Sequence, residues 1–219
     1  FRSLSDAVAD YSGTDNLYMG ENAGNGNAGT SNIGIGRNTF EGTTTAQQNI
    51  GIGYAAGAWI GTGQRNIGIG YAAYGAPYAS VPIDGNDNIA IGNDVNRNNL
   101  AGQVGVLAIG GYAYEMAQGS YATALGFEAL KAAQNSTGST AIGASAWMGG
   151  GQQNAVVGAY TGSQQKAAGG TTVGGDYNAV LGYGALYKAG GADYNVVAGH
   201  HAAFETRDAD RNVALGAGA

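Results

Sequence analysis

The sequence predicts an all-β fold in which tandem coils of about 17 residues stack into a parallel β-solenoid. Three observations support this prediction. A five-residue motif ending in glycine recurs twelve times. Glycine supplies 42 of the 219 residues, well above the usual share of about 7%. Charged residues make up only 11%, where about 25% is typical of globular proteins.

The motif runs from Asn16 to the end of the chain, and nine of its twelve copies begin with asparagine. The copies are NLYMG at 16, NIGIG at 32, 49 and 66, NIAIG at 88, VLAIG at 106, ATALG at 122, STAIG at 139, NAVVG at 154, NAVLG at 178, NVVAG at 195 and NVALG at 212. A further, degenerate copy is TTVGG at 171. A unit this short is too small for helix-pair repeats or propeller blades, but it suits one solenoid coil with two short strands and two turns.

Alternation within the motif assigns the side chains to two faces of a short strand. Branched aliphatic residues such as Ile33 and Ile35 share one face, which is expected to build the core, and the intervening glycine or alanine occupies the other. Stacking aligns equivalent residues into ladders, in which asparagine amides both donate and accept hydrogen bonds. The final glycine permits a turn with positive φ. The predicted ladder residues are Asn32, Ile33, Ile35, Gly36, Asn49, Ile50, Ile52, Gly53, Asn66, Ile67, Ile69 and Gly70.

A homotrimer is expected, because the glycine and alanine face would otherwise be exposed and a narrow coil buries little apolar surface. On the same face assignment, Ile69→Asp should disrupt folding, whereas Asp94→Ala should be nearly silent.

The chain organisation is predicted to be a lead-in segment at residues 1–15 followed by one β-solenoid domain at 16–219, with 12 to 13 coils. Two intervals between motifs are longer than the rest, Tyr71 to Asn88 and Ala159 to Asn178. Insertions in a solenoid become loops on its flank. The first of these holds both prolines and several aromatic residues. Its candidate receptor contacts are Tyr71, Tyr74, Pro77 and Tyr78.

Composition and motifs exclude or disfavour several other functions. Nine scattered basic residues and a net charge of −6 argue against nucleic-acid binding. No apolar run approaches the ~20 residues of a membrane span. The glycines of GIGYAAG recur in the coils rather than opening a helix, so no nucleotide loop is expected. GNDNIAIGND does not reproduce a calcium-binding repeat. No cofactor or metal site and no enzymatic activity are expected.

His200 and His201 are the only histidines, and strand alternation would place them on opposite faces.

Two other solenoid functions lack support in the sequence. A polysaccharide depolymerase needs an acidic pair in a groove of larger coils, and an ice-binding solenoid needs a regular threonine face.

The repeats resemble two families of extracellular fibre proteins. The segment NAVLGYGALYKAGGADYNVVAGHHAAFETRDADRNVALGAGA is similar to repeats of phage tail fibres and related virion proteins, which often end in an endosialidase-type chaperone domain. The motif also resembles the head repeats of trimeric autotransporter adhesins, which are left-handed parallel β-rolls in homotrimers. Asparagine at the opening position favours the phage family. The resemblance implies an extracellular tail-fibre segment that positions or makes contact with a glycan or protein receptor; the alternative is a bacterial surface adhesin.

Overall fold

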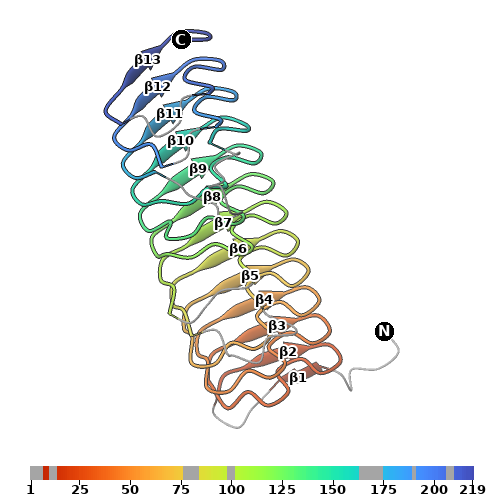
Figure 1. The fold of residues 1–219 in the computed structure, drawn as a ribbon. Coiled ribbons are helices and arrows are strands. Elements are labelled where there is room, and N and C mark those ends of the chain that lie inside the picture. Colours follow the sequence, from red (N-terminus) through yellow and green to blue (C-terminus); the bar gives the residue numbers. More distant parts are fainter. Residues whose placement is uncertain are drawn as a thin grey trace, which may run out of the picture. The chain divides into compact units, whose positions relative to one another are not determined.

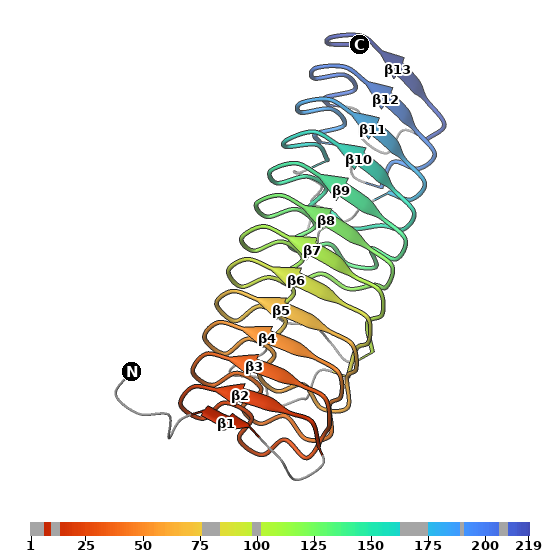
Figure 2. The ribbon, with the colours of Figure 1, turned by 180° about the vertical axis from the view of Figure 1, so that it is seen from behind.

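The computed structural model describes residues 7–9, 14–75, 84–97, 102–162, 175–188, 191–205 and 210–219. Within these ranges the chain is all-β, with thirteen three-residue strands and no helix. It divides into two compact units, an N-terminal unit of residues 1–106 and a C-terminal unit of residues 107–219. Both are parallel β-solenoids, as Figures 1 and 2 show, so the predicted all-β parallel solenoid is confirmed.

The N-terminal unit stacks its strands in sequence order and in register. Its strands are β1 (Ala7–Ala9), β2 (Leu17–Met19), β3 (Ile33–Ile35), β4 (Ile50–Ile52), β5 (Ile67–Ile69) and β6 (Ile89–Ile91). From β2 to β6 all pairs are parallel, and the register is the one expected from aligning the motifs. Strand β1 lies within the expected lead-in segment and pairs antiparallel with β2.

The C-terminal unit continues the same pattern with seven parallel strands. They are β7 (Leu107–Ile109), β8 (Thr123–Leu125), β9 (Thr140–Ile142), β10 (Ala155–Val157), β11 (Ala179–Leu181), β12 (Val196–Ala198) and β13 (Val213–Leu215). Each strand therefore pairs with the equivalent residues of its neighbouring coil.

Each described coil has one strand rather than the two expected, and turns form the remainder. Isolated bridges between Gln47 and Gln64, and between Asn86 and Val104, mark a second line of pairing in the N-terminal unit. The glycine that ends each strand does adopt positive φ, for example +130° at Gly36. Two positions after this glycine, a residue with a Cβ commonly adopts the left-handed backbone conformation, as Asn38 does with φ of 58°. This sharp reversal closes the coil without a second strand.

The face assignment made from the sequence is wrong. The central residue of each strand points into the solenoid, so Gly34 and Gly51 are buried while Ile33 and Ile35 are each 38% exposed. The glycines are needed because aromatic rings fill the interior. A Cβ on Gly51 would lie 3.0 Å from the ring of Phe40, closer than normal packing allows.

Large and small residues complement each other in both interiors. In the N-terminal unit, Tyr18, Phe40 and Tyr74 are buried among glycines and alanines. In the C-terminal unit the central strand position holds alanine in β7, β8, β9 and β13 and valine in β10, β11 and β12. Tyr114 and Trp147 fill the remaining space there and are fully buried.

Candidate interaction surface

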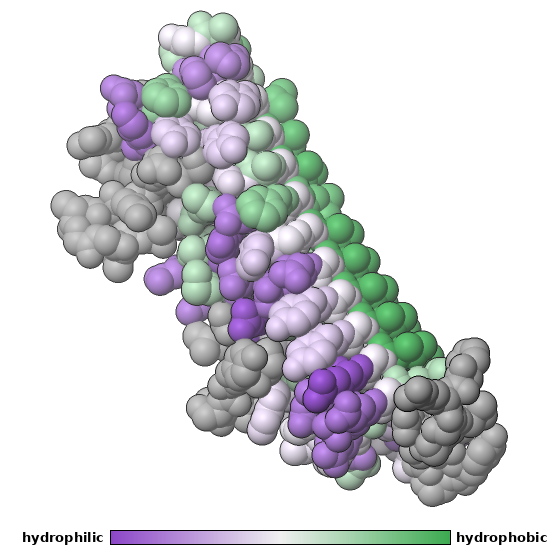
Figure 3. Space-filling view, turned by 90° about the vertical axis from the view of Figure 1, so that its right-hand side faces the viewer, coloured by the Kyte–Doolittle hydropathy of each residue, from purple (hydrophilic) through white to green (hydrophobic). Residues whose placement is uncertain are grey.

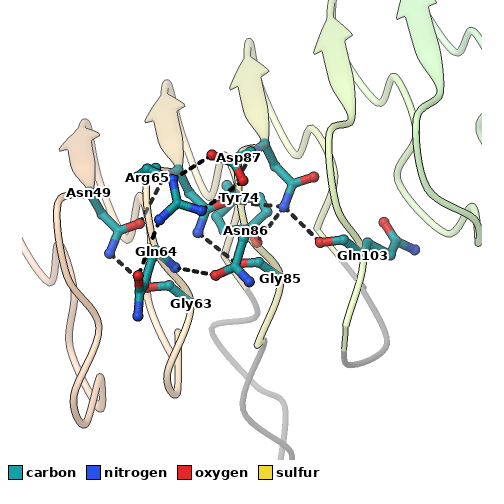
Figure 4. Close-up of polar contacts among 11 residues, drawn as sticks. Asn49, Gly63, Gln64, Arg65, Tyr74, Gly85, Asn86, Asp87 and Gln103 are labelled. Carbon is teal, nitrogen blue, oxygen red and sulfur yellow. Dashed lines mark hydrogen bonds and ion pairs between the residues drawn. The ribbon is translucent and has the colours of Figure 1, made fainter.

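A buried ladder of asparagines joins successive coils of the N-terminal unit (Figure 4). Asn32, Asn49, Asn66 and Asn88 are at most 1% exposed. The side chain of Asn49 donates to the Asn32 side-chain oxygen at 3.1 Å and to the Gly63 carbonyl at 3.0 Å. Its own oxygen accepts from the Asn66 backbone N–H at 2.8 Å. The hydrogen-bonded asparagine ladder expected from the sequence is thus present in these coils, and it fixes the register of the strands beside it.

The C-terminal unit has the same ladder from Asn154 through Asn178 and Asn195 to Asn212. Earlier in this unit the position holds Ala122 and Ser139 instead. The Ser139 hydroxyl donates to the Gly151 carbonyl and accepts from the Asn154 N–H, so it replaces the asparagine amide as both donor and acceptor.

Beside the ladder, the first and third residues of each strand form an outward surface, which we call the aliphatic face. In the N-terminal unit it comprises the outer residues of β2 to β6, namely Leu17, Met19, Ile33, Ile35, Ile50, Ile52, Ile67, Ile69, Ile89 and Ile91. Figure 3 shows aliphatic strand residues as a green stripe beside paler, more polar turns. Five strands spaced about 4.8 Å apart extend this face over roughly 20 Å. Contiguous exposed apolar surface of this kind is typical of interaction sites.

The aliphatic face of the C-terminal unit differs between its two columns. The third strand position remains bulky in most coils, as at Leu125, Ile142 and Leu181. The first position changes to threonine, alanine or valine from β8 onward. The side chains of the first column are therefore shorter in this unit than in the N-terminal unit.

Polar and aromatic turn residues border the aliphatic face. Arg65 binds both carboxylate oxygens of Asp87, at 2.6 and 2.8 Å, and lowers the pKa of that carboxyl. Arg37 lies 3.2 Å from Glu21. These pairs are exposed and contribute little stability. Tyr54 stacks on Tyr71. Protein interfaces commonly have an apolar centre and a polar rim and are enriched in aromatic residues.

The predicted receptor residues do not form one surface cluster. Tyr71 is 45% exposed, which is compatible with contact to a partner. Tyr74 is fully buried, and its hydroxyl accepts a hydrogen bond from Asn88 at 3.0 Å. Burial raises the pKa of Tyr74 above its ordinary value. Tyr74 is therefore a core residue, and its assignment as a receptor contact is wrong. Pro77 and Tyr78 lie outside the described residues.

The two histidines also depart from expectation. Their rings lie 4.1 Å apart and do not point to opposite faces. The reason is the left-handed backbone of His201, with φ of 54°, since alternation applies only to extended chain. Among the residues that the structure describes, no group of three or more potential metal-ligating side chains occurs.

Asp94 was expected to be a silent surface residue, but it is only 6% exposed. It lies 2.9 Å from Arg97 and accepts a hydrogen bond from Asn93 at 2.7 Å. We therefore expect the opposite stability ranking in a single chain, with Asp94→Ala costing more than Ile69→Asp, because Ile69 is part-exposed and Asp94 is a buried, paired charge.

Comparison with protein-family models, with curated proteins and with solved structures gave no match. No helix in the described ranges has the length and apolar character required to cross a membrane.

Proposed function

We propose that this chain is a structural segment of an extracellular fibre, specifically a phage tail fibre, which self-associates as a homotrimer and positions or makes contact with a host receptor. The observation that carries the proposal is the in-register aliphatic face on a chain of very low charge. The resemblance of the repeats to phage tail fibres supports the fibre, and their resemblance to the heads of trimeric adhesins supports three subunits.

The periodicity of the aliphatic face favours a second copy of the chain as its partner. Its residues recur at the strand spacing of about 4.8 Å, so a surface with the same spacing can place its side chains between them. Another copy has that spacing by construction. Burial of each part-exposed isoleucine then contributes favourable free energy of about 25 cal/mol per Å² of apolar surface removed from water.

The reason for self-association differs from the one inferred from the sequence. The glycine and alanine column is already covered within the chain, so it needs no partner. It is the aliphatic column that remains uncovered. Receptor contact by Tyr71 stays part of the proposal, with Tyr74 removed from the candidate set.

The proposal predicts that Ile52→Lys dissociates the assembly while the solenoid remains folded. Ile52 is 37% exposed, so a lysine there can reach solvent in one chain but loses water in an interface. Sedimentation velocity should show a smaller species, and circular dichroism should retain its β-type spectrum. The matched control is Thr45→Lys, at an exposed residue of the same unit outside the strands.

Two results would contradict the proposal. Dissociation by both lysine variants would mean that added charge, rather than its place on the aliphatic face, separates the chains. Unchanged assembly of Ile52→Lys would mean that this face is not the interface.

A further inference from the structure

Pairs of exposed tyrosines in neighbouring coils lie almost parallel and in contact. The rings of Tyr177 and Tyr194 have centroids 4.8 Å apart and an interplanar angle of 6°. The rings of Tyr54 and Tyr71 are 5.2 Å apart at 9°. All four side chains are between 40% and 50% exposed. Both separations are close to the strand spacing of about 4.8 Å, so the coil repeat itself sets them.

The backbone holds these rings in place before any reaction. Tyr177 and Tyr194 share the same left-handed conformation, with φ of 59° and 58°. Each immediately precedes a residue of the buried asparagine ladder, Asn178 and Asn195. The Arg211 guanidinium lies 5.5 Å from the centroid of the Tyr194 ring, and that ring stacks on Tyr177. The second pair is held by the Ala72 N–H, which donates to the Tyr54 carbonyl at 2.8 Å.

We propose that Tyr177–Tyr194 and Tyr54–Tyr71 are sites of oxidative dityrosine formation, which joins consecutive coils covalently. The co-reactant is a one-electron oxidant, such as a haem peroxidase with hydrogen peroxide. Each phenol gives up one electron and one proton, and the two phenoxyl radicals join through a new bond between ring carbons ortho to the hydroxyls. The two ortho hydrogens move to the phenolic oxygens, so two hydrogen atoms are lost overall and one peroxide is reduced to two waters.

The chain contains no cysteine, so these bonds would be its means of cross-linking one coil to the next. Each closes a loop of 17 residues, as the difference in residue numbers shows for both pairs. A short covalent loop restricts the unfolded chain, as a disulfide does. The inference concerns coils within one chain and does not depend on the fibre proposal.

The chain offers a matched site that cannot react. Tyr187 stacks on Phe204 with centroids 4.9 Å apart and an angle of 5°, the same geometry in neighbouring coils. Phenylalanine has no hydroxyl and does not form a phenoxyl radical. Three further tyrosines separate the effect of ring geometry from that of exposure. Tyr160 and Tyr183 meet at 67°, and Tyr121 is the most exposed described tyrosine at 68%.

The test treats the purified protein with a haem peroxidase and hydrogen peroxide and maps cross-linked peptides by mass spectrometry. Dityrosine fluorescence measures the total yield, and denaturing gels separate products within one chain from those between chains. We expect the 177–194 and 54–71 pairs to dominate within single chains. Tyr177→Phe should abolish the first pair and leave the second unchanged. Phe204→Tyr should create a new pair at 187–204.

Peroxide can also oxidise the exposed Met19 and Met116 to methionine sulfoxide. Mass spectrometry distinguishes this side reaction, because it adds an oxygen atom whereas tyrosine coupling removes two hydrogen atoms. Circular dichroism of each variant verifies that the fold is kept. The proposal is overturned if Tyr121 or the 160–183 pair couples as readily as the stacked pairs. It is also overturned if cross-links occur only between chains, or if Phe204→Tyr gains none.

Discussion

Replacing Gly36 by alanine is expected to cost more than about 3 kcal/mol of stability, a large fraction of the 5–15 kcal/mol typical of a folded domain. Two effects add. Gly36 has φ of +130°, which residues with a side chain rarely adopt, at a cost of about 1–3 kcal/mol. The new Cβ would also lie 2.5 Å from the carbonyl oxygen of Gly53 in the next coil. The Gly53 backbone is held in place, because its N–H donates a hydrogen bond to the Ile35 carbonyl at 2.8 Å.

The shift in the thermal midpoint, followed by circular dichroism, measures this loss. Gly216→Ala is the matched control, since Gly216 has a similar φ of +120° but nothing within 4 Å of the added Cβ. Its loss should be limited to the backbone strain. If both variants lose the same stability, crowding between coils is not the reason for the repeating glycine.

The second large effect is expected for Asn49→Ala. The substitution leaves the Asn66 N–H without its acceptor at 2.8 Å, and it removes the shorter of two hydrogen bonds to the Gly63 carbonyl, which keeps the Gln47 N–H at 3.3 Å. A buried donor left unsatisfied costs about 1–3 kcal/mol, so the loss should be several times that of an ordinary surface substitution. The side chain also contacts Asn32, and the neighbouring coil therefore loses a donor as well.

Chemical unfolding of Asn49→Ala and of Asn22→Ala gives the comparison. Asn22 also bonds to an asparagine one coil away, at 3.2 Å to Asn38, but that contact is exposed to water. Its removal should change the midpoint little, because water replaces the lost partner. Similar losses for the two variants would show that burial does not determine the value of the ladder.

The sequence was sufficient to predict the solenoid, the coil length and the register, because these follow from repetition itself. Asn32, Asn49 and Asn66 recur at the same motif position, and stacking must then bring them together. The positive φ of the final glycine followed from its lack of a Cβ.

The face assignment could not be made from alternation alone, since a polar, apolar, small, apolar pattern is consistent with either face turned inward. The usual preference for burying isoleucine pointed the wrong way. A better signal was present in the central column, where Tyr18, Val156 and Val180 replace glycine or alanine. Apolar residues of different sizes at one position indicate that the position faces the interior, where the available space differs between coils.

The candidate receptor residues were grouped by closeness in sequence, which does not fix orientation in a tight turn. Tyr74 has φ of 47°, and this left-handed conformation belongs to a side chain that lies inside the solenoid. Tyr71 follows the strand-ending glycine and remains outside. A left-handed backbone conformation at His201 likewise accounts for the adjacent rings of His200 and His201.

Sedimentation equilibrium of the unmodified protein at micromolar concentration tests the central claim most directly. If the aliphatic face is an interface between copies of this chain, the protein should sediment with three times the chain mass and show no folded monomer. A stable, folded monomer at this concentration would contradict the account, because the aliphatic face would then be exposed in solution without a partner.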